Sequence, residues 1–232
     1  WFSGEVVSTA ILTRLPVTLS LVIGTTLVAS VVAVALGVTA AMRRGWVDRV
    51  LQVVTLLGFA LPGFWIALML VRFFAIDMRL FPATGFIPLS ASFTGWLSTV
   101  TLPITALAIG GIAGIAQQVR SSVISTLRQD YVRTLRSRGL SPARITRHVL
   151  RNASGPALTV LALQFVGLLG GAVIVEQIFA LPGLGLLAVT ATTRGDLPIV
   201  MGVVIVTAVL VILVNLTMDI VNGWLNPKAR VA

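Results

Sequence analysis

The sequence predicts an all-α protein, a polytopic helical bundle that crosses a membrane about five times. Of its 232 residues, 57% are hydrophobic and only 10% are charged, whereas soluble domains carry roughly 25% charged residues. Uncharged stretches long enough to cross a bilayer, about 20 apolar residues each, alternate with segments that hold the basic residues. Because these charged residues are too few to cover the surface of a soluble protein of this size, we expect a membrane protein.

The first two spans are expected at residues 15–41 and 50–71. Residues 15–41 carry no charge, and at about 1.5 Å per residue their helix exceeds a hydrocarbon core of roughly 30 Å, so it should tilt or project. Pro62-Gly63 interrupts the second span. A membrane helix tolerates such a pair where neighbouring groups satisfy the freed carbonyls, and we therefore expect a kink there.

Three further spans are expected at residues 102–119, 156–179 and 199–221. The stretch before the third span contains several prolines and glycines together with aromatic residues, which is typical of a segment at the membrane interface. A Gly/Pro-rich connection, residues 181–185, joins the fourth span to the fifth.

The basic residues are distributed unequally between the two sides of the predicted membrane. Thirteen Lys and Arg fall on one side, near residues 43–49, 120–151 and 228–230, and four fall on the other. The positive-inside rule makes the richer side cytoplasmic, with the C-terminus on that side and the N-terminus outside. This explains the net charge of +10 without a nucleic-acid partner, and membrane lipid is the expected surrounding. A chain that starts outside without a signal peptide suggests that a further span precedes Trp1.

The longest cytoplasmic connection, residues 117–155, has a regular pattern. Residues 122–138 contain no Gly or Pro and space their apolar side chains at helical intervals, which predicts one basic helix. Gly139 is a helix stop, and Ser141-Pro142 begins a second helix, which should end before Gly155-Pro156 opens the fourth span. Periodicity alone leaves two interpretations open: docking to a soluble partner, or anchoring to anionic lipid.

The run DYVRTLRSRGLS, from Asp130 to Ser141, followed by RHVLRNA and Pro156, resembles the coupling loop of permease subunits of bacterial binding-protein-dependent ABC importers. In particular, it resembles the dipeptide/oligopeptide/nickel branch. The resemblance continues through GGAV at residues 170–173, Glu176, PGLG at residues 182–185, Asp196 and the C-terminal segment that includes Asn226-Pro227. Arg133, Thr134 and Leu135 stand where the general motif has Glu-Ala-Ala, and the peptide branch usually has Ala in place of Leu135.

The resemblance implies a type I ABC importer permease-like fold, in one transmembrane permease domain over residues 1–232 with residues 117–155 as its cytoplasmic coupling loop. It implies a bacterial inner-membrane importer of short peptides, with nickel or glutathione as alternatives within the family. The implied partners are a second homologous permease, two cytoplasmic ATPases that bind ATP and Mg²⁺, and an extracytoplasmic substrate-binding protein. The family also has a first span and a large external segment ahead of residue 15. The residues implied to contact the ATPase are Asp130, Tyr131, Arg133, Thr134, Arg136, Gly139, Leu140, Ser141 and Pro142.

A possible pathway or gate is expected on the external side, at Glu176 with the Pro182, Gly183 and Gly185 turn. An ionisable residue in a span is costly and is therefore a functional candidate. A salt bridge or snorkelling at the interface, and a plain turn before the last span, remain the alternatives. Asp219 is interpreted as a structural partner of nearby arginines.

No enzyme active site or cofactor is expected in this chain. It has no phosphate-binding Gly-rich loop followed by Lys and Ser or Thr, and no paired carboxylates or Ser/His/Asp arrangement. One histidine and no cysteine give no metal-ligand set. The rival function is an ion-gradient-driven secondary transporter or a channel, which would be marked by internal repeats and charges near the bilayer midplane.

Overall fold

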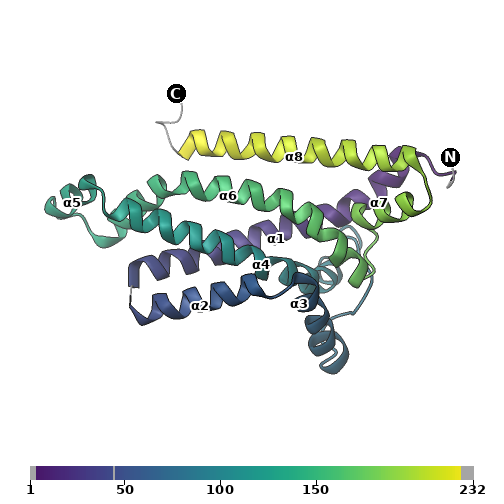
Figure 1. Ribbon diagram of the computed structural model, residues 1–232, viewed down its shortest axis with the longest axis horizontal. Helices are drawn as coiled ribbons and strands as arrows, with labels where there is room; N and C mark the ends of the chain where they lie inside the picture. Colours follow the sequence, from purple (N-terminus) through teal and green to yellow (C-terminus); the bar gives the residue numbers. More distant parts are fainter. Residues whose placement is uncertain (1–3, 44, 226–232) are drawn as a thin grey trace. The chain divides into compact units, whose positions relative to one another are not determined.

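The computed structural model describes residues 4–43 and 45–225, and helices account for most of them (Figure 1). The elements are α1 (Val7–Arg43), α2 (Trp46–Ala60), α3 (Gly63–Leu70), the π-helix η1 (Val71–Asp77), α4 (Phe93–Leu127), α5 (Asp130–Ser137), α6 (Pro142–Ile178), α7 (Leu184–Thr193) and α8 (Leu197–Leu225). Helices α1, α4, α6 and α8 are long and apolar enough to cross a membrane, and α2 with α3–η1 makes a fifth span if the pair is counted as one. The predicted all-α, multi-span fold is confirmed. Arg44, Asn226, Pro227, Lys228 and Arg230 lie outside the described residues.

The second predicted span is two helices and not one kinked helix. Helix α2 ends at Ala60, α3 begins at Gly63, and their axes are bent by 95°. The break falls at the predicted Pro62-Gly63 pair because Pro62 is extended, with φ −63° and ψ 131°, and a residue that precedes proline avoids the α region. The Pro62 carbonyl accepts from the Trp65 and Ile66 amides and so starts α3. The predicted position of the kink is confirmed, but a single helix over residues 50–71 is wrong.

The chain divides into two compact units, which are described separately. The first comprises Trp1–Val28, Leu61–Gly110 and Gln164–Leu213, and the second comprises Ala29–Ala60, Gly111–Leu163 and Val214–Ala232. The four long helices therefore contribute one part of their length to each unit.

The first unit has two apolar clusters. One joins α1, α3, α4 and the end of α6, and its fully buried members include Leu21, Ala67, Val100 and Leu181. The other packs α7 against the start of α1 and of α8, through Ala10, Leu187 and Ile199 among others. Helix α7 was not predicted, because its ten residues, Leu184–Thr193, are too few for a span.

The second unit contains α2, α5, the start of α6 and the ends of α1, α4 and α8. Helices α1 and α4 approach closely at Gly37, where a Cβ atom would lie 2.6 Å from the Ala116 carbonyl oxygen and 2.8 Å from the Val119 Cβ atom. Helix α2 has no buried residue among those with a described side chain. Its side chains therefore face a cavity or the surroundings of the unit.

Candidate functional site

The predicted coupling segment contains one more break than expected. Helix α4 continues to Leu127, and α5 begins at Asp130, so a single helix over residues 122–138 is wrong. The Arg128 and Gln129 amides donate to the Ser125 and Thr126 carbonyls, each at 3.2 Å, which tightens the last turn of α4. Gln129 is then extended, with ψ 147°. Asp130 follows in the first turn of α5, where a carboxylate is favoured by the helix dipole.

Helix α5 ends at Ser137, and a Schellman turn with Gly139 as its left-handed residue follows it. The Gly139 amide donates to the Arg136 carbonyl at 3.0 Å, and the Leu140 amide donates to the Leu135 carbonyl at 3.3 Å. These two bonds define the motif, and they require a left-handed residue between them. Gly139 supplies it with a φ of +74°. The predicted helix stop at Gly139 and the restart at Pro142 are confirmed.

Helix α6 runs without interruption from the coupling segment into the fourth span. It begins at Pro142 and ends at Ile178, with Pro156 inside it. The expectation that a separate helix ends before Gly155-Pro156 is wrong, because a membrane helix can continue past a proline when neighbouring groups satisfy the carbonyl that the proline leaves free. The predicted coupling segment and the fourth span therefore share one helix.

Contacts between α5 and the start of α6 fix the segment. Val132 of α5 is completely buried, and Ile145 and Val149 of α6 are also buried. The Asn152 amide donates to the Tyr131 hydroxyl at 2.9 Å. This bond joins the short α5 to α6.

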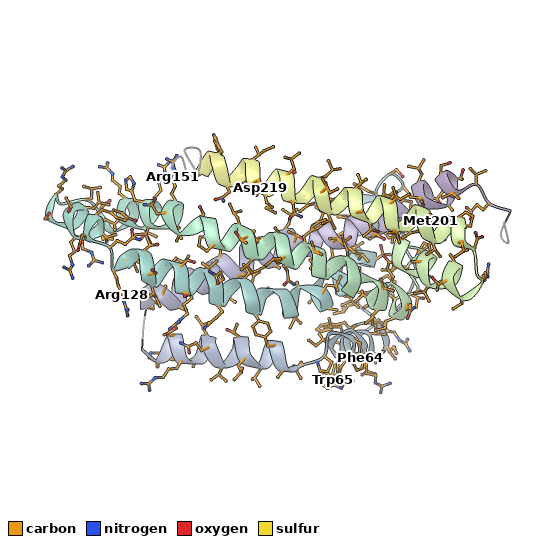
Figure 2. All side chains as sticks on the ribbon, turned by 45° about the horizontal axis from the view of Figure 1, so that its top comes forward. Phe64, Trp65, Arg128, Arg151, Met201 and Asp219 are labelled. Atoms are coloured by element: carbon orange, nitrogen blue, oxygen red, sulfur yellow. The ribbon has the colours of Figure 1, made fainter. Side chains whose placement is uncertain are left out.

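The remaining side chains of the segment are available to a partner. Asp130 and Arg133 lie 3.8 Å apart but are 97% and 81% exposed, so their attraction contributes little. Figure 2 shows Arg128 at the end of α4 and Arg151 on α6. These two arginines extend the basic surface of the segment before α5 and after the α5–α6 turn. Of the nine residues predicted to contact an ATPase, Tyr131 and Leu140 are half-buried and the others are exposed: Asp130, Arg133, Thr134, Arg136, Gly139, Ser141 and Pro142.

Glu176, in the first unit, lies at the centre of a buried network of hydrogen bonds. Its side chain is completely buried. The Thr18 hydroxyl donates to its Oε1 atom at 2.6 Å, and the Leu186 amide donates to its Oε2 atom at 2.9 Å. The Leu184 amide donates to the Thr18 hydroxyl oxygen at 2.8 Å. The carboxylate thereby ties α6 to α1 and to the start of α7.

Two glycines of the adjacent turn leave room for this carboxylate. A Cβ atom on Gly183 would collide with the Glu176 carboxylate, and one on Gly185 would lie 2.9 Å from its Oε2 atom and 2.8 Å from the Val173 Cα atom. Pro182 lines a separate cavity of about 300 Å³ together with Arg14 and Arg194. The structure thus brings Glu176, Gly183 and Gly185 together, and a pathway or gate role for them stays a prediction.

The sequence did not predict an ion pair in the second unit. The Arg120 guanidinium donates to both Asp48 oxygens, at 2.5 and 2.6 Å, and the two side chains are only 20% and 14% exposed. Arg120 counted only as one of the cytoplasmic basic residues, and the sole signal for a partner was an acid at the start of the second span. Asp219 is exposed. No group of three metal-ligating side chains occurs within residues 4–43 and 45–225.

Comparison with known proteins assigns the chain to a family. The family model "Binding-protein-dependent transport system inner membrane component" matches residues 33–231. A putative peptide transport system permease protein of Brucella abortus is 39% identical over 98% of this chain and 73% of its own length. The dipeptide transport system permease protein DppB of Bacillus subtilis is 37% identical over 93% of this chain and 68% of its own.

Solved structures show the same fold at low sequence identity. The methionine ABC transporter MetNI in an inward-facing conformation matches 90% of this chain and 93% of its own, with a TM-score of 0.72 and 17% identity. An amino acid ABC transporter matches 93% of this chain and 94% of its own, with a TM-score of 0.68 and 15% identity. The predicted importer permease fold is confirmed. This chain belongs to the family of inner membrane components of binding-protein-dependent transport systems.

Proposed function

We propose that this chain is the permease subunit of an ATP-driven importer of short peptides. The relatives from Brucella abortus and Bacillus subtilis are named as peptide and dipeptide permeases, which supports the substrate class. A second, similar permease would supply the other half of the translocation pathway. An extracytoplasmic binding protein would deliver the peptide, and two cytoplasmic ATPases would bind ATP and Mg²⁺.

The observation that carries the coupling role is the exposed, rigid turn between α5 and α6. The Schellman turn at Gly139 fixes its backbone, and buried Val132 and the Asn152–Tyr131 bond hold α5 in place. A surface element transmits force only if it does not deform by itself. Docking into a groove of the ATPase would therefore move α6 with the turn.

The resulting mechanism is alternating access between two states. ATP binding closes the ATPase pair, the docked turn follows its groove, and the continuous α6 carries the movement into the membrane. Such a switch requires different contacts in the two states. The chain itself supplies positioning and a path, and the chemistry of ATP hydrolysis belongs to the partner subunits.

The orientation follows from the charges. The α5–α6 turn and the C-terminus would lie in the cytoplasm and the α6–α7 turn outside, with the chain in the bacterial inner membrane. The basic excess around residues 120–151 supports this arrangement.

The test uses the complete transporter in proteoliposomes, with ATP supplied on the side of the membrane that carries the ATPase subunits. Arg133→Asp should abolish co-purification of the ATPases or reduce ATP-driven uptake of the peptide about tenfold, since a hydrogen bond to a charged partner is worth about 1.5–3 kcal/mol. The swap of Asp130→Arg with Arg133→Asp rebuilds the local pair but should not restore uptake. Arg72→Asp breaks a comparable exposed pair, Arg72–Asp77 at 3.3 Å, on the predicted external side, and should leave uptake normal.

Other outcomes would contradict the coupling role. Normal uptake by Arg133→Asp, or rescue by the swap, would show that this arginine matters only within α5. Uptake that continues without ATP and stops with an ionophore would favour a secondary transporter. Competition of labelled dialanine by nickel or glutathione, and not by other dipeptides, would assign one of the alternative substrates.

A further inference from the structure

Helix α2 presents two exposed faces of different composition. Val50, Val54 and Leu57 form one face and are 50%, 55% and 56% exposed. The spacing of three and four residues places Arg49, Gln52, Val53, Leu56 and Phe59 on another face. The first face is wholly apolar, as expected for contact with lipid, whereas the second mixes apolar, amide and cationic groups.

The mixed face lines a cavity of about 590 Å³. Gln117 of α4 lines the same cavity, as does Thr55, whose hydroxyl donates to the Leu51 carbonyl. Amide and charged side chains in a span are costly in lipid and normally face a protein interior or a water-filled space. The cavity is therefore expected to be hydrated in the assembled protein.

The charge of the cavity wall is positive. The nearest carboxylate, Asp48, accepts two bonds from Arg120 and one from the Gln52 amide at 3.2 Å. Arg49 has no ion pair with a described part of the chain. The Arg49 guanidinium and the Gln117 carboxamide lie along a wall that Leu56 and Phe59 make partly apolar. The Gln52 carboxamide lies there too, with its NH₂ group donating to Asp48 and its carbonyl oxygen left to accept.

These groups complement the carboxyl end of a peptide. A guanidinium binds a carboxylate with two parallel hydrogen bonds, a carboxamide pairs with a peptide N–H and C=O, and the apolar wall accommodates a small side chain. We propose that the α2–α4 cavity contacts the transported peptide at its free carboxylate through Arg49, Gln52 and Gln117. This inference rests on the proposed import function.

The structure also explains how α2 keeps this orientation. Because no described side chain of α2 is buried, apolar packing holds the helix only weakly. The bidentate Asp48–Arg120 pair fixes its beginning. Toward its other end, the Phe59 ring lies over Gly114, where a Cβ atom would be 3.4 Å from the ring edge.

Cysteine accessibility tests the cavity, because the chain has no cysteine of its own. Gln52→Cys and Phe59→Cys probe the cavity face, and Val54→Cys and Leu57→Cys are matched controls on the other face of the same helix. The complete transporter in proteoliposomes is treated with a charged, water-soluble methanethiosulfonate, with and without trialanine delivered by the binding protein. The cavity-face cysteines should react, and trialanine should slow their reaction about tenfold; the controls should not react.

Three results would overturn the inference. Equal reaction on both faces would show that α2 has no lipid-facing side. Unreactive cavity-face cysteines in a complex that imports trialanine would show that lipid or the second permease fills the space. Reaction without protection would show a hydrated space that the peptide does not enter. In each case, continued import of trialanine would still support the proposed import function. Only a loss of import would count against both the import function and the cavity inference.

The carboxylate contact has a separate test. Arg49→Gln should lower uptake of trialanine about tenfold, which corresponds to one charge-assisted contact, while Arg49→Lys keeps most of it. Uptake of trialanine amide, relative to the parent transporter, should be unchanged in Arg49→Gln. Arg43→Gln removes an exposed arginine outside the cavity and is the control. Equal loss of both peptides in Arg49→Gln would overturn the assignment.

Discussion

At the scale of single residues, Glu176 is a completely buried carboxylate of the first unit. Its two carboxylate oxygens accept from a hydroxyl and a backbone amide, and no part of the side chain is exposed. A buried polar group is stable only when its bonds are made, and removing one partner leaves the others unsatisfied. The network therefore requires a hydrogen-bond acceptor at this position, whereas a gate would require the negative charge.

Substitution of Glu176 separates these two requirements. In Glu176→Gln, the amide oxygen can accept from the Leu186 N–H while the NH₂ group donates to the Thr18 hydroxyl oxygen. We expect thermal stability in detergent and peptide uptake close to those of the parent protein. Glu176→Leu should lower the free energy of unfolding by about 2–4 kcal/mol, because it leaves the hydroxyl and the amide without a partner. A stable Glu176→Gln protein that no longer imports peptide would instead support the gate.

At the scale of elements, the turn between α5 and α6 depends on one backbone conformation. Gly139 has a φ of +74°, and its substituent position meets no atom within 4 Å. The constraint is therefore conformational and not steric. A residue with a Cβ atom costs roughly 1–2 kcal/mol in this region, and asparagine tolerates it best among the others.

A series at Gly139 tests whether the shape of this turn matters for coupling. Gly139→Asn should keep the Schellman turn and most of the ATPase-coupled uptake. Gly139→Pro cannot adopt a positive φ and removes the donor to the Arg136 carbonyl, so it should uncouple uptake while the chain still inserts and purifies. Gly170→Ala is the control, because Gly170 lies in α6 with nothing within 4 Å of an added Cβ atom, and it should be neutral or slightly stabilising. Equal uptake by Gly139→Asn and Gly139→Pro would contradict a coupling role that depends on the shape of the turn.

The sequence predicted those elements whose signals are local. Gly139, Pro142 and Pro62 act on their own backbone, and each stands where the structure begins or ends a helix. The continuous α6 was missed because Gly155-Pro156 is also a local break signal, which the rest of the long helix overrides. The extra helix break before Asp130 was missed because no Gly or Pro marks it in the sequence.

The candidate sites depend on contacts between distant residues, and these were only partly predictable. Glu176 and the two glycines that enclose it could be singled out from sequence, but Thr18 could not, because it lies 158 residues away. The Asp48–Arg120 pair joins residues 72 positions apart and could not be predicted from sequence for the same reason. Charge pattern identifies which residues are costly in a membrane, and only the folded chain shows how each is satisfied.

At the scale of the whole molecule, the distribution of charge predicts which side of the membrane is cytoplasmic. Thirteen of the 17 basic residues fall on the side predicted to be cytoplasmic, and three of these, Arg44, Lys228 and Arg230, lie outside the described residues. The rule acts through residues close to the span ends and does not depend on net charge. The orientation can therefore be tested independently of transport.

Single cysteines in this cysteine-free chain report the orientation directly. Ser137→Cys lies at the end of α5, and Ser90→Cys lies in the segment before α4; both serines are exposed. In intact spheroplasts, a membrane-impermeant maleimide should label Ser90→Cys and spare Ser137→Cys, and in inside-out vesicles the pattern should reverse. Detergent-solubilised protein, in which both should react, controls for burial. Labelling of Ser137→Cys in intact spheroplasts would place the basic turn outside, where no ATP-driven partner could reach it, and the coupling proposal would fail together with the orientation.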